Sequence, residues 1–298
     1  MSINKSPVFT GAATAIITPF RDNKLDLAAY KKLIEFQIDG GIDAIVVCGT
    51  TGEASTLTDD EHREMIAKTV EYVAGRVKIV AGTGSNDTAY ALELSEFAKS
   101  AGADAILQVT PYYNKTTQAG LVKHFYTIAD KVDLPMILYN VPGRTGMTIN
   151  PETYKILSEH PNIVATKEAC GKLETVIQTA HLCGDALGIY SGEDSNIVPI
   201  LSVGGLGVIS VLSNVVPRET HDMCKLFFEG KIKESAKLQV DFIDLIDALF
   251  CEVNPIPVKT AMKLIGLDTG EVRLPLVDME PKNAERLKAA MKAHNLIK

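Results

Sequence analysis

The sequence predicts an α/β fold, a (β/α)8 barrel, with a helical domain attached at its C-terminal end. Eight short runs of β-branched or apolar residues alternate with amphipathic stretches of helical period. The runs are apolar on both faces, which is typical of parallel strands covered by helices. Eight such units, joined by right-handed crossovers, close most naturally into a barrel of about 230 residues.

The eight predicted strands share this apolar or β-branched character. In chain order they are AATAIIT (12–18), DAIVVCG (43–49), VKIVAG (77–82), DAILQVT (104–110), PMILYNV (135–141), NIVATK (162–167), LGIYSG (187–192) and LGVISV (206–211). The stretches between them, such as 25–41, 58–75 and 86–102, have helical period, acidic or Asn/Thr starts and often a glycine near the end. The repeated unit is therefore strand followed by helix.

An open, doubly wound sheet is the rival architecture. Against it, the turn after the first strand reads TPFRDN, and no strand-to-helix turn carries a GxGxxG or P-loop pattern. Beyond Gly230 the period changes, because 231–250, 257–266 and 281–296 are helical with no strand between them. We therefore predict a barrel over 1–230 and a helical domain over 231–298.

The composition indicates an ordinary globular protein with a small-molecule partner. The net charge of −7 and the scattered lysines and arginines argue against a nucleic-acid or membrane surface. The five cysteines are odd in number and form no CxxC pair, which is typical of a reducing compartment. The N-terminal stretch MSINKSPVFTG lacks the apolar region of a signal peptide, so we expect a cytoplasmic location.

Lys167 is the first candidate for chemistry. In (β/α)8 barrels the active site forms at the C-terminal ends of the strands, and Lys167 ends the sixth predicted strand. A lysine in a dry, apolar site has its charged form disfavoured, and the free amine can attack a carbonyl to form a Schiff base. The alternative is a structural ion pair with a nearby carboxylate such as Glu168, and position alone leaves both interpretations open.

Other polar residues follow the neighbouring strands. Tyr139, the Thr50–Thr51 pair and the Tyr112–Tyr113 pair supply hydroxyls that could relay protons. Arg144, between two glycines after the fifth strand, could bind a carboxylate with two hydrogen bonds. Each residue alone also fits a packing tyrosine, a common turn or a solvated loop arginine, so only their coincidence at one face favours chemistry.

A catalytic metal is not predicted. Five of the six histidines fall within helical patterns, and His160 closes the fifth helix, so we expect none to point into the barrel mouth. The acidic start at 59–62 is better explained as charge that complements a helix N-terminus. Activity is expected to survive exhaustive chelation.

Taken together, these motifs resemble the dihydrodipicolinate synthase and N-acetylneuraminate lyase family along essentially the whole chain. GTTGE, TPYYNK, YNVPGRTG, TKEA, GVISV and NPIPVK occur in the family's order. Paired threonines in GTTGE and an arginine in YNVPGRTG resemble the synthase branch. The resemblance implies that pyruvate and L-aspartate semialdehyde condense through an imine, with no cofactor, on the diaminopimelate and lysine pathway.

The resemblance also implies a role for each site residue. Lys167 is expected to form the imine, and Thr51, Tyr139 and Tyr113 to relay protons, with Tyr113 reaching in from a neighbouring subunit. Further expected contacts are Thr50 to the pyruvate carboxylate, Arg144 to the carboxylate of the second substrate, and the backbone carbonyls of Gly192 and Ile209 near the imine. A homo-oligomer, a dimer of dimers, is then expected.

One departure from the family concerns regulation. Relatives that are inhibited by lysine use a histidine where this chain has Asp59 and a glutamate where it has Tyr90, whereas His62, Asn86 and Tyr112 match. Losing the glutamate removes a charge-assisted contact worth roughly 1.5–3 kcal/mol, so we expect weak or absent inhibition by lysine.

Two other functions stay open. The nearer one keeps the lysine imine but changes the electrophile, as in an N-acetylneuraminate lyase or a 2-keto-3-deoxy sugar acid aldolase. Arg144 separates them, because a short carboxylated aldehyde needs a cation and a polyol chain does not. The other is a keto-acid sensor without turnover, for which loss of the lysine or the relay tyrosines would be expected.

Overall fold

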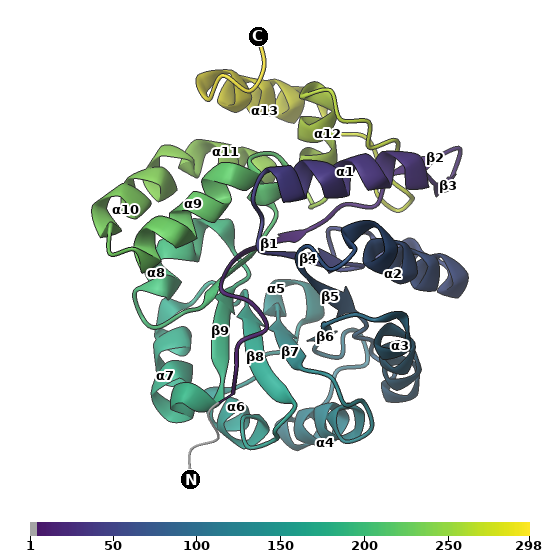
Figure 1. Cartoon of the computed structure of the whole chain (residues 1–298), viewed down its shortest axis with the longest axis vertical. Helices are drawn as coiled ribbons and strands as arrows, with labels where there is room; N and C mark the ends of the chain where they lie inside the picture. Colours follow the sequence, from purple (N-terminus) through teal and green to yellow (C-terminus); the bar gives the residue numbers. More distant parts are fainter. Residues whose placement is uncertain (1–4) are drawn as a thin grey trace.

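The computed structural model describes residues 5–298, and its centre is a closed, all-parallel barrel of eight strands (Figure 1). Residues 1–4 lie outside the described residues. They begin the N-terminal stretch for which the sequence predicts no signal peptide. The barrel strands are β1 (Gly11–Ala15), β4 (Ala44–Val47), β5 (Lys78–Gly82), β6 (Ala105–Val109), β7 (Met136–Asn140), β8 (Ile163–Glu168), β9 (Gly188–Ser191) and β10 (Gly207–Ser210). Each pairs with its neighbour in sequence, and β10 pairs with β1 to close the ring. The predicted fold class is confirmed.

Helices cover the outside of the barrel after each strand (Figure 1). They are α1 (Leu27–Asp39), α2 (Asp59–Val73), α3 (Thr88–Ala101), α4 (Gln118–Ala129), α6 (Pro151–Leu157), α7 (Leu173–Cys183), α8 (Ile197–Leu201) and α9 (Pro217–Phe228), with a one-turn helix α5 (Pro142–Thr145) before α6. Their starts follow from local chemistry, since the side chains of Asp26, Thr58 and Asp87 accept backbone N–H bonds from the first turns of α1, α2 and α3.

The interior of the barrel is a packed core. Every barrel strand contributes buried side chains to it, including Ala13, Val46, Val80 and Ile209. The aromatic ring of Tyr190 stacks on that of Phe9 with centroids 4.3 Å apart, and its hydroxyl donates to the Phe9 carbonyl. This packing restricts a solvent-filled site to the ends of the strands, where the loops begin.

The predicted strands are longer than the observed ones at some ends. The stretch 43–49 forms a strand only over Ala44–Val47, because Cys48 has a φ of +55° and turns the chain out of the sheet. Glu53, at the end of the same loop, also has a positive φ of +54°. The two turns give the GTTGE loop a sharply bent shape at the mouth of the barrel.

Beyond residue 230 the chain forms α10 (Ile232–Asp241), α11 (Ile243–Leu249), α12 (Ile256–Leu264) and α13 (Pro281–Ala293). The predicted single stretch 231–250 is two helices, with the break at Phe242. Leu245, Val258 and Leu287 belong to the same buried cluster as barrel residues such as Ile17. The two parts therefore share one core. The predicted division into domains at residue 230 stays a prediction.

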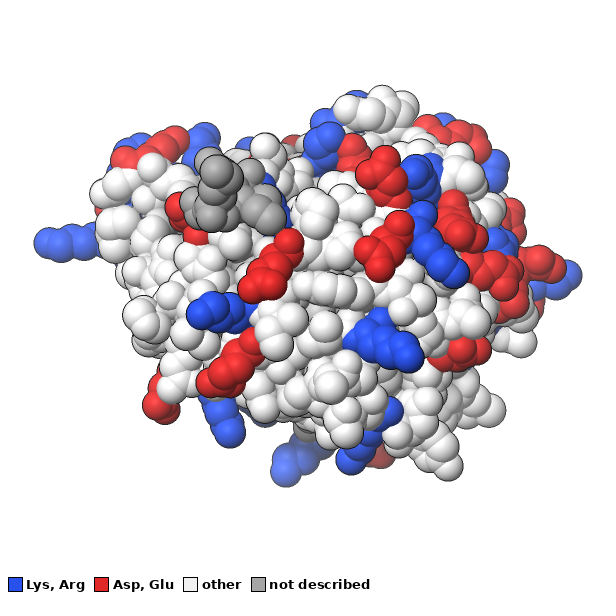
Figure 2. Space-filling model, turned by 90° about the horizontal axis from the view of Figure 1, so that it is seen from below, with Lys and Arg blue, Asp and Glu red and all other residues white. Residues whose placement is uncertain are grey.

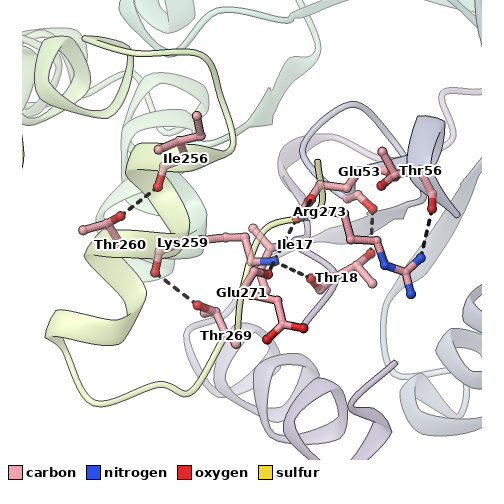
Figure 3. Close-up of polar contacts among 12 residues, drawn as sticks. Ile17, Thr18, Glu53, Thr56, Ile256, Lys259, Thr260, Thr269, Glu271 and Arg273 are labelled. Atoms are coloured by element: carbon pink, nitrogen blue, oxygen red, sulfur yellow. Dashed lines mark hydrogen bonds and ion pairs between the residues drawn. The ribbon is translucent and has the colours of Figure 1, made fainter. Parts of the chain in front are cut away.

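A buried ion pair joins the C-terminal helices to the mouth of the barrel (Figure 3). Lys259 Nζ lies 2.8 Å from Glu53 Oε1, and the two side chains are 2% and 1% exposed. The ammonium also donates to the backbone carbonyl of Thr18, 3.0 Å away, and Glu53 Oε2 accepts from the backbone N–H of Arg273. Helix α12 thus holds the end of the GTTGE loop, far away in sequence.

The surface carries charges of both signs. On the face shown in Figure 2, lysines and arginines lie scattered among acidic and uncharged side chains. Within residues 5–298, no helix is long and apolar enough to cross a membrane.

Candidate active site

A cavity of about 360 Å³ opens at the C-terminal ends of β4, β5, β6 and β7. Its lining includes Thr50, Tyr112, Tyr139 and Arg144. The cavity brings together residues from four separate predicted strand ends, as expected for a barrel active site.

Lys167 lies beside this cavity, on β8. Its side chain is 6% exposed, and its Nζ lies 4.3 Å from the centre of the Tyr139 ring on the adjacent strand β7. Tyr139 and Lys167 are direct register partners, so the sheet itself sets this contact. Among the described residues, no ion pair includes Lys167.

Glu168 does not pair with Lys167. Adjacent residues of a strand point to opposite faces, and Glu168 instead accepts hydrogen bonds from Asn140 Nδ2, at 2.9 Å, and from the Tyr154 hydroxyl, at 2.9 Å. Burial raises the pKa of the Glu168 carboxyl to about 7. The sequence left two interpretations of Lys167 open, and the ion pair with Glu168 that one of them requires does not form.

Gly192 lies against Lys167. A Cβ at this position would meet Lys167 Cε at 3.1 Å and Ala169 Cβ at 2.8 Å, so a larger residue would displace the lysine. Ile209 is 1% exposed on β10 and packs in the same interior cluster as Tyr139. The carboxylate of Asp194 accepts the backbone N–H bonds of Val211 and Leu212, which ties the ends of β9 and β10 together.

The two threonines of GTTGE have different surroundings. Thr50 lines the cavity together with Tyr139. Thr51 is 3% exposed, and its Oγ1 accepts a hydrogen bond from Asn254 Nδ2 at 2.9 Å. The sequence could not separate these environments, because they depend on how the loop bends.

Arg144 lies in the one-turn helix α5 and lines the cavity. Its Nη2 donates to the backbone carbonyl of Asn254 at 3.3 Å. Asn254 therefore contacts both Thr51 and Arg144, although it was not among the predicted site residues. The NPIPVK motif that contains it was the available signal.

Of the predicted site residues, Thr50, Tyr139 and Arg144 line this cavity, whereas Lys167, Thr51, Gly192, Ile209 and Tyr113 do not. Among these five, Tyr113 is the exposed one. It is 93% exposed with a φ of +65°, whereas its neighbour Tyr112 is 39% exposed and lines the cavity. The exposed phenol belongs to the loop between β6 and α4.

One prediction about histidines is wrong. His62, on α2, lines the cavity, and its Nε2 lies 2.8 Å from the Gly82 carbonyl at the end of β5. The helical pattern located His62 correctly, but it could not show that the start of α2 reaches the mouth. In the part of the chain that the structure describes, no three histidine, cysteine or acidic side chains gather as a metal would require.

Asp59 and Tyr90, the two positions at which the family resemblance implies a departure from lysine-inhibited relatives, are hydrogen-bonded to each other. The Tyr90 hydroxyl donates to Asp59 Oδ1 at 2.7 Å. Burial, with a smaller effect of this hydrogen bond, raises the pKa of Tyr90 to about 12. Tyr90 and His62 both line the cavity, so this pair lies at its edge.

Comparisons with known proteins agree with this geometry. The model of the dihydrodipicolinate synthetase family matches residues 8–294. A 4-hydroxy-tetrahydrodipicolinate synthase from Acetivibrio thermocellus is 53% identical over 98% of this chain and 100% of its own length.

Two solved structures are similarly close in fold. A dihydrodipicolinate synthase from Cyanidioschyzon merolae with lysine bound has a TM-score of 0.95 at 40% identity, covering 98% of this chain and 100% of its own. A monomeric dihydrodipicolinate synthase variant also has a TM-score of 0.95 at 40% identity, covering 97% of this chain and 98% of its own. The chain belongs to the dihydrodipicolinate synthetase family.

Proposed function

We propose that this protein is a 4-hydroxy-tetrahydrodipicolinate synthase, a lyase that condenses pyruvate with L-aspartate semialdehyde. The observation that carries the proposal is Lys167, a buried amine that forms no ion pair among the described residues and is held against Tyr139 at the barrel mouth. The names of curated relatives at about half identity support the choice of reaction.

The chemistry begins at Lys167 Nζ. It attacks the keto carbon of pyruvate, and loss of water leaves an imine. Loss of a proton from the pyruvate methyl group gives an enamine, whose carbon attacks the aldehyde carbon of the second substrate while the aldehyde oxygen takes up a proton. The substrate's amine then closes the ring onto the imine carbon and releases Lys167.

Each of these steps moves a proton, and hydroxyls near the imine supply the path. Tyr139 is the first member of this relay, because its ring contacts Lys167 Nζ. The family resemblance assigns the next hydroxyl to Thr51 and the pyruvate carboxylate to Thr50. The cavity lining favours the reverse, because Thr50 shares the cavity with Tyr139 while the Thr51 hydroxyl is held by Asn254.

Arg144 supports aspartate semialdehyde over a sugar aldehyde. Its guanidinium lines the cavity, where it can bind the carboxylate of a short substrate with two hydrogen bonds. The backbone carbonyls of Gly192 and Ile209 are proposed to lie near the imine, consistent with the close packing of Gly192 on Lys167.

An assembly of identical chains completes the site in this proposal. Tyr113 is 93% exposed and outside its own chain's cavity lining, which suits a phenol that enters the site of a neighbouring copy. A dimer of dimers in the cytoplasm, acting without a cofactor, is therefore proposed. The five cysteines, all unpaired, fit that reducing compartment.

The test is to trap the imine. The protein is incubated with pyruvate and borohydride, and peptide mapping locates the added mass, with Lys167→Ala as control. A reduced adduct on Lys167 supports the mechanism, and aspartate semialdehyde is then offered against sugar aldehydes as second substrate. No adduct, or an adduct on another lysine such as Lys115, would remove the basis of the proposal.

A further inference from the structure

Asn254 joins two parts of the site from outside the predicted barrel. It is 5% exposed and lies between α11 and α12, in the C-terminal segment. Its side chain donates from Nδ2 to Thr51 Oγ1, and its backbone carbonyl accepts from Arg144 Nη2. One residue thus contacts a hydroxyl of the GTTGE loop and the guanidinium that is proposed to bind the second substrate.

The remaining polar atom of this side chain is unpaired. Asn254 Oδ1 is buried and has no hydrogen-bond partner among residues 5–298. A buried acceptor without a partner costs about 1–3 kcal/mol, so such an atom is expected to receive a donor, from water or from a ligand. Because Oδ1 and Nδ2 are bonded to the same carbon, the empty acceptor lies directly beside Thr51.

The chemistry of the second substrate indicates which donor that is. In L-aspartate semialdehyde the carboxylate and the ammonium are attached to the same carbon. If Arg144 binds the carboxylate, the ammonium lies within two bonds of it, next to the residue whose carbonyl Arg144 already contacts. An ammonium has three donors and no acceptor, and it needs an oxygen such as Oδ1.

We propose that Asn254 is a specificity residue that accepts a hydrogen bond from the ammonium of the second substrate through Oδ1 while it positions Thr51 through Nδ2. The inference rests on the proposed function, because it takes an aminated, carboxylated aldehyde as the electrophile. It adds a determinant that separates this substrate from an aldehyde with a carboxylate and no amine. The site thus recognises both charges of the amino acid, Arg144 the negative one and Asn254 the positive one.

The experiment compares aspartate semialdehyde with succinate semialdehyde, which lacks the ammonium. For pyruvate-saturated enzyme, we measure the KM for the first and the inhibition constant for the second. Asn254→Ala is expected to raise the KM roughly tenfold or more, the value of one hydrogen bond to a charged group, and to change the inhibition constant less than threefold. Asn254→Asp keeps an acceptor but loses the donor to Thr51, so it should retain the preference for the aminated substrate while the KM for pyruvate rises.

Val253→Ala, a neighbouring change at a side chain that is 55% exposed, is the matched control and should leave both constants unchanged. Equal losses for both compounds in Asn254→Ala would overturn the inference, because a structural role affects them alike. An Asn254→Asp variant without the preference would also overturn it. Borohydride trapping of pyruvate on Lys167 reports separately on the proposed function, so failure of the wild type in that assay is distinguishable from failure of this inference.

Discussion

Removal of the Lys259 ammonium is expected to destabilise the whole protein. Lys259 and Glu53 are 2% and 1% exposed, so neither charge has access to water that could replace its partner. In Lys259→Met the Glu53 carboxylate keeps the Arg273 N–H as a partner but loses the cation, and the carbonyl of Thr18 loses a donor. Breaking one side of a buried pair costs about 3–5 kcal/mol, a large share of the roughly 5–15 kcal/mol that keeps a protein folded.

The measurement is urea denaturation of four proteins: wild type, Lys259→Met, Glu53→Gln and the double variant. Because each single change leaves one buried charge or acceptor alone, the double variant should lose less stability than the sum of the two single variants. Lys288→Met is the matched control, since the Lys288–Glu285 pair is 40% and 72% exposed and should contribute at most about 1 kcal/mol. A loss below about 1 kcal/mol in Lys259→Met would refute the reasoning that burial makes this pair indispensable.

Three further predictions concern the site. Thr50→Val should lower kcat roughly 10²–10⁴-fold, whereas Thr51→Val should mainly raise the KM for pyruvate. The opposite pattern in steady-state kinetics would restore the roles implied by the family resemblance, with Thr51 in the proton relay and Thr50 at the pyruvate carboxylate. Burial raises the pKa of Glu168 from 4.5 to about 7, so the folded state holds this proton more tightly than the unfolded state does. The free energy of unfolding should therefore fall by about 3 kcal/mol as the pH rises from 4.5 to 7. In Glu168→Gln, denaturation midpoints measured across this range should lose that dependence on pH. Lysine should inhibit weakly or not at all, because Tyr90 stands where the family resemblance implies a glutamate in lysine-inhibited relatives, and its hydroxyl donates to Asp59. Micromolar inhibition in a direct assay would contradict this.

The barrel could be predicted from the sequence because its signal is local and repeated. Strands that are apolar on both faces alternate with helices whose first turns are capped by residues such as Asp26 and Thr58, and each unit repeats the same pattern. The position of Lys167 at a strand end followed from the same pattern. The exact ends of the strands did not, because a positive φ at Cys48 is set by the loop that follows it.

The fold class, the family and the set of reactive side chains follow from the sequence alone, because these depend on periodicity and on short motifs. Which neighbours those side chains meet depends on how the whole chain folds. The tertiary structure separated Lys167 from Glu168, placed His62 in the cavity, and brought Asn254 from the C-terminal helices to Thr51, 203 residues away in the chain. Such contacts depend on the closure of the barrel and on the packing of α12 against its mouth, and no local pattern records which distant residue will fill a given space.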